Sequence, residues 1–145
     1  MKLKIAWIGK TKDPAVHSLT TEYLKRISRY VDVEGLPLAD EAALLKLCDK
    51  SRLLHTLVLL DSRGKELSSE EFAEFLQNHQ DRNPQSLVLA IGPADGFSDG
   101  VRKAANTNLS LGKMTLPHEL ARVVLLEQVY RAFTILKGHP YHSGH

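Results

Sequence analysis

Residues 109–145 carry more information about this chain than any other stretch; they read LSLGKMTLPHELARVVLLEQVYRAFTILKGHPYHSGH. The pattern predicts a short apolar strand at Leu109 and Leu111, a tight loop from Gly112 to Pro117, and a long helix from about His118 to Lys137. Apolar residues occur nearly all round that helix, so more than one of its sides must be covered. One side can pack on the chain's own sheet. We expect a second copy of the helix to cover the other side, which predicts a homodimer.

Upstream of this stretch, strand patterns alternate with helix patterns. The runs Leu57–Leu60 and Leu87–Ile91 are continuously apolar, as expected of central parallel strands that are covered on both faces. A strand near Val31 to Leu38 contains Gly35 and Pro37, which predicts an edge strand. Helix starts are expected at Asp13-Pro14, Asp40, Ser68 (with Glu71 in a capping box) and Ser98, and a turn at Asp61-Ser62-Arg63-Gly64. This order predicts an α/β fold, a three-layer sandwich with a mainly parallel sheet, in a single domain of residues 1–145.

The composition is that of a water-soluble globular protein. Of the 145 residues, 43% are hydrophobic and 25% are charged, and no apolar stretch is long enough to span a bilayer. We therefore expect a cytoplasmic protein. The single cysteine, Cys48, lies in a helical pattern beside Leu44, Leu45 and Leu47, and we expect an ordinary buried thiol there.

The formal net charge of +2 is unevenly distributed along the chain. Residues 1–30 carry seven Lys or Arg against two Asp or Glu, and residues 101–145 carry six against two. If both basic ends meet on one face of the fold, they can present a positive patch to an anionic partner. The alternative is a surface on which both signs are mixed, and charge alone favours that alternative.

The C-terminal stretch also carries a family resemblance. Four of its segments resemble the C-terminal signature of the SPOUT-class methyltransferases: Thr115-Leu116-Pro117-His118, Arg122-Val123-Val124, Glu127–Ala132 and His139-Pro140-Tyr141-His142. Within that class they are most similar to the enzymes that methylate N3 of a pseudouridine in 23S ribosomal RNA. The resemblance implies a C-terminal trefoil knot, S-adenosylmethionine as cofactor, and a homodimer that acts on 23S rRNA in the large subunit or the whole ribosome. A non-catalytic nucleotide- or RNA-binding α/β module is the alternative.

Three loops follow apolar strands, at the edge where ligands of open parallel sheets bind. They span residues 60–64, 92–96 and 112–117, and none matches a dinucleotide fingerprint or a phosphate-cradling loop. The resemblance implies that S-adenosylmethionine lies against backbone and aliphatic groups of Leu60, Gly92, Leu111, Gly112, Lys113, Met114, Thr115 and Leu116. The family pattern has two consecutive glycines in the middle loop. Here the second is Pro93, which has no N–H to donate.

The tail supplies groups suited to orienting a base or accepting its proton, namely His139, Tyr141 and His142. Arg131 either contacts RNA across a dimer or pairs with Glu127, four residues before it. Arg122 has the same two options, with Glu119 or Glu127 as the carboxylate.

Other histidines and the end of the chain complete the candidate set. His118 is expected to make a structural hydrogen bond at the helix start. The spacing of His139, His142 and His145 is metal-like, but a tail offers no fixed geometry and no cysteine or carboxylate partner, so no metal is expected. Ser143 stands where the family has a basic residue, so a cation of the tail is missing.

Overall fold

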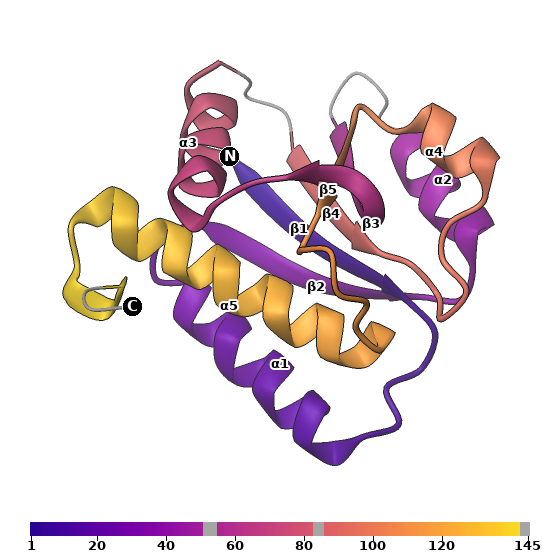
Figure 1. Ribbon diagram of the computed structural model, residues 1–145, viewed down its shortest axis with the longest axis horizontal. Helices are drawn as coiled ribbons and strands as arrows, with labels where there is room; N and C mark the ends of the chain where they lie inside the picture. Colours follow the sequence, from indigo (N-terminus) through magenta and orange to yellow (C-terminus); the bar gives the residue numbers. More distant parts are fainter. Residues whose placement is uncertain (51–54, 83–85, 143–145) are drawn as a thin grey trace.

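A computed structural model describes residues 1–50, 55–82 and 86–142, except for the side chains of Asp49, Lys50 and His142. Five strands alternate with five helices, and a short 3₁₀ turn, η1, ends the described chain (Figure 1). The elements are β1 (Lys2–Ile8), α1 (Pro14–Ile27), β2 (Asp32–Leu38), α2 (Glu41–Lys50), β3 (His55–Glu66), α3 (Ser69–Arg82), β4 (Ser86–Ile91), α4 (Asp99–Ala104), β5 (Thr107–Ser110), α5 (His118–Lys137) and η1 (Pro140–His142).

The strands form one parallel sheet in the order β2-β1-β4-β3-β5. Side chains alternate between its faces, so Leu3 and Ile5 of β1 join one core while Ala6 of the same strand joins the other. Helices α1, α3 and α5 cover the first face, and α2 and α4 cover the second. The predicted three-layer α/β sandwich is confirmed, and the strand containing Gly35 and Pro37 lies at the sheet edge.

Strand β3 is longer than the sequence predicts. The expected turn at Asp61–Gly64 is wrong, because β3 continues to Glu66 and pairs with β5 on both sides of a register shift between Leu60 and Lys65. This irregularity bends the strand without ending it. A Cβ at Gly64 would lie 2.5 Å from the carbonyl carbon of Leu109, so only glycine lets the two backbones approach this closely.

The predicted helix starts are confirmed by their caps. Asp13 accepts a hydrogen bond from the Ala15 N–H at 2.8 Å, and Asp40 accepts one from Ala43 at 2.9 Å. In the capping box, the Glu71 N–H donates to Ser68 Oγ and the Ser68 N–H donates to Glu71. These side chains satisfy backbone donors that a helix start leaves free.

Helix α5 has the predicted bounds and one stripe that its own chain covers only in part, here called the uncovered stripe. Leu125, Leu126, Val129, Ala132 and Phe133 form its buried face against the sheet and neighbouring helices. The opposite stripe comprises Leu120, Val124, Glu127 and Arg131, at spacings of four, three and four residues. Leu120 is 45% exposed and the other three are half-buried; of the described helices and strands, none lies over the side of α5 that faces the viewer in Figure 1.

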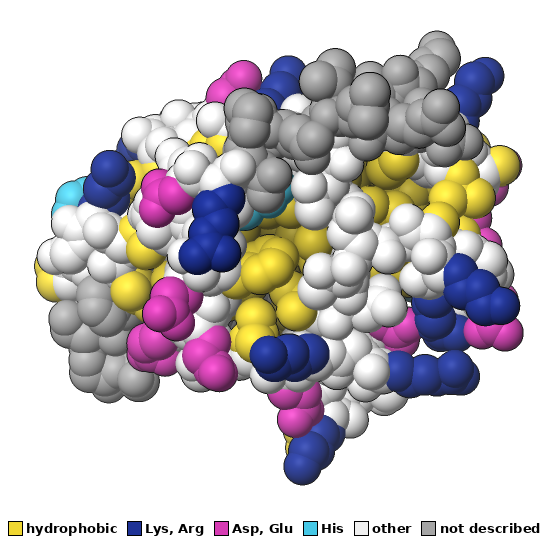
Figure 2. Space-filling model, turned by 90° about the horizontal axis from the view of Figure 1, so that it is seen from above, with side chains coloured by type: hydrophobic (Ala, Val, Ile, Leu, Met, Phe, Trp, Pro, Cys, Tyr) yellow, Lys and Arg dark blue, Asp and Glu magenta, His cyan; other side chains and the backbone are white. Residues whose placement is uncertain are grey.

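The face seen from above shows Lys and Arg side chains interspersed with Asp and Glu, around a hollow floored by apolar side chains (Figure 2). Among the described residues, no helix has the length and apolar character needed to cross a membrane. The trefoil knot stays a prediction from the resemblance.

Candidate active site

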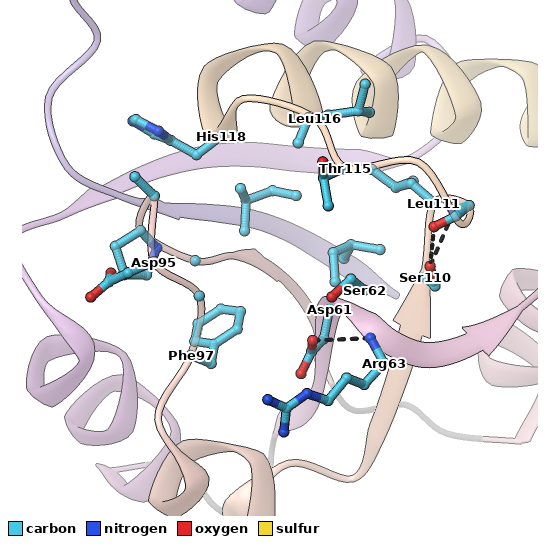
Figure 3. A pocket seen from close by; sticks show the side chains of 18 of the residues that line it. Asp61, Ser62, Arg63, Asp95, Phe97, Ser110, Leu111, Thr115, Leu116 and His118 are labelled. Carbon is cyan, nitrogen blue, oxygen red and sulfur yellow. Dashed lines mark hydrogen bonds between the residues drawn. The ribbon is translucent and has the colours of Figure 1, made fainter.

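A cleft of about 350 Å³ opens at the carboxyl edge of the sheet, between the three loops that the sequence singles out. Figure 3 shows the loop from Ser110 to His118 along one side, and Asp95 and Phe97 on a second loop across from it. Asp61, Ser62 and Arg63 of β3 lie on the remaining side. A volume of this size falls in the range of small-molecule sites.

The loop after β5 is fixed by a side chain that the sequence did not single out. Ser110 Oγ donates to the Gly112 carbonyl oxygen at 2.8 Å and accepts from the Gly112 N–H at 3.1 Å. Gly112 has φ +140°, a conformation that other residues rarely adopt. The loop therefore leaves β5 in one defined direction and runs along the cleft.

The loop after β4 closes the cleft with a tight turn and an aromatic ring. The Gly96 N–H donates to the Pro93 carbonyl oxygen at 2.9 Å, so Pro93 serves as an acceptor although it has no N–H of its own. Phe97 lines the cleft, and a Cβ at Gly92 would lie 3.0 Å from its ring. Gly92 thus lets the Phe97 ring approach the backbone closely.

Asp61 and Arg102 form an ion pair at the third side of the cleft. Local sequence patterns do not predict this pair, because 41 residues separate the two. The Asp61 side chain is only 6% exposed. Burial works to raise the pKa of Asp61, but the Arg63 N–H and the Arg102 guanidinium outweigh it, so the pKa lies below its usual value. Asp61 therefore stays ionised at neutral pH and fixes α4 against β3.

Seven of the eight predicted cofactor residues line this cleft: Leu60, Gly92, Leu111, Gly112, Met114, Thr115 and Leu116. Lys113 lies in the same loop but does not line the cleft, and its side chain is exposed. His118 lines the cleft as well. The expected structural hydrogen bond of His118 is not found among the described residues, so its imidazole is available at the cleft edge.

The described tail residues form a second cluster, here called the tail cluster, in which they pack against Tyr30, just after α1, and against the second half of α5. Tyr141 Oη donates to Glu127 at 3.0 Å, and Arg131 pairs with the same carboxylate at 2.8 Å, which confirms one predicted partner of Arg131. The Tyr141 ring packs edge-on against Tyr130 at 4.8 Å between centroids, and the Tyr30 hydroxyl is hydrogen-bonded to His139 Nδ1. The His142 side chain and His145 lie outside what the structure describes.

Glu127 joins two of the predicted catalytic groups in this tail cluster. Burial, together with hydrogen bonds to Tyr23 and Glu127, raises the pKa of Tyr141 far above its ordinary value. The phenol therefore keeps its proton at neutral pH and acts as a hydrogen-bond donor, not as a base.

Arg122 has neither of its expected roles. It is 1% exposed, donates to Thr11 Oγ1 at 2.8 Å and to Thr20 Oγ1 at 3.3 Å, and lies over the Trp7 ring at 4.2 Å. Burial lowers its pKa. The buried position excludes direct contact between Arg122 and RNA in this arrangement.

The cleft lies at the first turn of α5, and the tail cluster lies along its second half. At about 1.5 Å per residue, Glu127 and Arg131 lie about 14 and 20 Å along the helix from His118, and Lys137 lies about 28 Å from it. Within one chain the structure brings the predicted cofactor residues together, but His139, Tyr141 and Arg131 are not among the residues that line the cleft. Figure 1 shows the end of α5 and the C-terminal turn at the far side of the molecule from the start of that helix.

Gly92 provides a direct test of the cleft. Gly92→Val should weaken S-adenosylmethionine binding at least about a hundredfold, because the added side chain collides with Phe97 and fills the space beside it. Calorimetric titration measures the affinity, and circular dichroism checks the fold. Gly100→Val is the matched control, since a Cβ there meets only Ser98 Oγ at 3.8 Å. An unchanged affinity of the Gly92 variant would place the cofactor elsewhere.

Known proteins match this chain over nearly its whole length. Residues 1–142 match the family model described as "Predicted SPOUT methyltransferase". A protein of Koribacter versatilis named "Ribosomal RNA large subunit methyltransferase H" is 60% identical over 146 residues, which covers 100% of both chains. A protein of the same name from Geobacter sp. is 44% identical over 98% of this chain and 99% of its own length.

Solved structures share the fold at low sequence identity. A probable methyltransferase from Bordetella pertussis superposes with a TM-score of 0.61 at 12% identity, covering 90% of this chain and 93% of that one. The SpoU methyltransferase AviRb from Streptomyces viridochromogenes, crystallised in complex with the cofactor AdoMet, gives a TM-score of 0.52 at 12% identity, covering 88% of this chain and 56% of its own. With a family model that matches nearly its whole length, relatives that are 60% and 44% identical and a shared fold, this chain belongs to the SPOUT methyltransferase family.

Proposed function

We propose that this protein transfers a methyl group from S-adenosylmethionine to N3 of a pseudouridine in 23S ribosomal RNA, as a homodimer acting in the cytoplasm. The observation that carries the proposal is the separation of the cleft, at the first turn of α5, from the tail cluster along the second half of that helix. Neither site alone holds both a place for a cofactor and groups that can orient a base. The names of the relatives that are 60% and 44% identical support ribosomal RNA as the substrate.

The cleft suits S-adenosylmethionine in size and chemistry. Leu60, Leu111 and Leu116 offer aliphatic walls for an adenine, and the turns at Gly92 and Gly112 expose backbone donors and acceptors. When bound there, the cofactor supplies a methyl group on a positively charged sulfur. The side chains of the cleft then need to hold and orient it, because positioning dominates a transfer of this kind.

The uncovered stripe of α5 supports a dimer in which the two α5 helices run antiparallel. We take the two helices to cross at Val123 and Val124. Positions 131 and 117 each lie about seven residues from this crossing, so position 131 of one chain lies opposite position 117 of the other. The two-fold symmetry then repeats the arrangement at the second cleft. A parallel pairing would leave both tails far from both clefts. Antiparallel packing therefore assembles two complete sites from two incomplete halves.

Within such a site the tail residues take different roles. Arg131 and Tyr141 share the Glu127 carboxylate, which holds a cation and an aromatic ring in fixed positions for a base to contact. The Tyr30 hydroxyl is hydrogen-bonded to His139 Nδ1, so this ring nitrogen already has a partner within the chain. We therefore assign the N3 proton to the imidazole of His142, a tail residue whose side chain lies outside what the structure describes.

A methyl-transfer assay tests the proposal. Purified protein, labelled S-adenosylmethionine and ribosomes that lack the modification should give one labelled pseudouridine in 23S rRNA, which digestion and mass spectrometry locate. Free rRNA and isolated large subunits, assayed in parallel, identify the physiological substrate. Binding of S-adenosylmethionine without transfer to any of these substrates would instead support the non-catalytic module.

A further inference from the structure

We propose that three lysines at the rim of the cleft, Lys10, Lys12 and Lys113, bind phosphate groups of the ribosomal RNA. This surface, here called the cleft rim, rests on the proposed function, because it assigns the face on which the RNA substrate lies. Lys10 and Lys12 belong to the loop between β1 and α1, and Lys113 belongs to the loop between β5 and α5.

The loop of residues 9–13 stands at the edge of the cleft. Glu119 Oε1 accepts hydrogen bonds from the Lys12 N–H at 2.9 Å and the Asp13 N–H at 3.2 Å. Glu119 follows His118, which lines the cleft, and Ala121 lines it as well. The first turn of α5 therefore holds the backbone of Lys12 beside the cleft, and Lys113 belongs to the loop that runs along the cleft into this turn.

The buried side chain of Arg122 anchors this loop to the core. Its guanidinium donates to Thr11 Oγ1 at 2.8 Å, and no carboxylate of the described residues forms an ion pair with it. A buried cation without a carboxylate is expensive. Here its contacts with Thr11, Thr20 and the Trp7 ring tie the loop to the core. A loop fixed in advance loses little conformational entropy when RNA binds.

The three side chains are exposed and positively charged without an acidic partner. In the described part of the chain no carboxylate pairs with any of them, whereas Lys2 and Lys4 both lie near Glu34. The acidic groups of the neighbouring sequence are already engaged: Asp13 accepts the Ala15 N–H, and Glu119 accepts the two amides of the loop. The basic first and last segments of the sequence thus meet at this rim.

The position of these charges selects the partner. A methyl acceptor has to enter the cleft, so the strand that carries it must cross the rim. Exposed ammonium groups on a fixed backbone suit phosphates, which position a nucleic acid without reading its sequence. Each phosphate that a cation neutralises adds to the salt dependence of binding.

The salt dependence of binding to unmethylated ribosomes tests this assignment. The association constant is measured at constant Mg²⁺ between about 50 and 200 mM KCl. The logarithm of this constant falls linearly with the logarithm of the salt concentration, and Lys10→Ala/Lys12→Ala should make the fall less steep by about 1.5. Adding Lys113→Ala should make it less steep still. The KM for ribosomes should rise about tenfold in the double variant, with kcat and the affinity for S-adenosylmethionine unchanged.

Lys2→Ala/Arg82→Ala is the matched control. It removes the same net charge at the opposite, amino edge of the sheet, where β1 begins and α3 ends. Its salt slope should equal that of the unmodified protein. A rim variant with an unchanged slope on ribosomes that are still methylated would overturn the rim assignment and leave the proposed function intact. If the unmodified protein neither binds nor methylates ribosomes, the proposed function fails, and the rim assignment fails with it.

Discussion

Truncation after Gly138 should reduce methyl transfer at least about a thousandfold while the affinity for S-adenosylmethionine stays unchanged. The deleted residues include His139, Tyr141 and His142, which follow the C-terminal end of α5, whereas the cleft of the same chain lies at its first turn. Cofactor binding survives because the cleft is intact, whereas the RNA base loses the groups that align it; a misplacement of about 1 Å already costs about a hundredfold in rate. Single-turnover transfer and calorimetry on the same sample separate the two effects.

Shorter changes in the tail show which group matters. Truncation after His142 is the control and should retain transfer, because the proposed tail groups remain. Tyr141→Phe keeps the ring but removes its hydrogen bond to Glu127, so its loss of rate should be modest. His142→Ala should be severe if that imidazole takes the proton. Full activity after deletion beyond Gly138 would rule out the tail and leave Arg131 and the cleft loops.

Leu120→Glu should convert the dimer into a folded, inactive monomer. Leu120 is 45% exposed in the single chain, so folding tolerates a charge there, but in the proposed dimer the same position lies in an apolar interface. Burying that charge costs about 3 kcal/mol or more, which weakens association more than about a hundredfold. Light scattering after size-exclusion chromatography measures the mass, and circular dichroism measures the fold.

The choice of position matters because α5 serves two surfaces. Val129 is fully buried and Phe133 nearly so, and acidic substitutions there would unfold the chain before reporting on the dimer. Ala104→Glu, on exposed α4 across the sheet, is the control and should remain dimeric and active. A monodisperse, fully active monomer of the unmodified protein at micromolar concentration would refute the dimer.

The layered fold could be predicted because the residues that determine each helix or strand are close together in the sequence. Apolar runs, cap residues and the stop at Gly138 depend on neighbours within a few positions, and the bounds of α5 follow from them. The extension of β3 could not be predicted in this way. Asp61-Ser62-Arg63-Gly64 has turn-forming residues, and only the close approach of β5 to Gly64 keeps the segment in the sheet.

In the candidate site, too, local features could be predicted and tertiary contacts could not. Glycine-rich loops after apolar strands mark the cleft, since parallel strands end at one edge. The pair Asp61 and Arg102, the Phe97 ring over Gly92 and the burial of Arg122 depend on tertiary contacts between distant segments. The position of the tail relative to the cleft also depends on the length of α5 and on which side of it remains uncovered.

Mixing two inactive variants tests the composite site most directly. Gly92→Val has a damaged cleft and an intact tail, and the protein truncated after Gly138 has the reverse. After subunit exchange, each mixed dimer should contain one complete site, formed by the cleft of the truncated chain and the tail of its partner, and methyl transfer to ribosomes should reappear. If mixed dimers form, as mass spectrometry of the intact complex can show, and transfer does not return, the tail does not act on the partner's cleft and the account is contradicted.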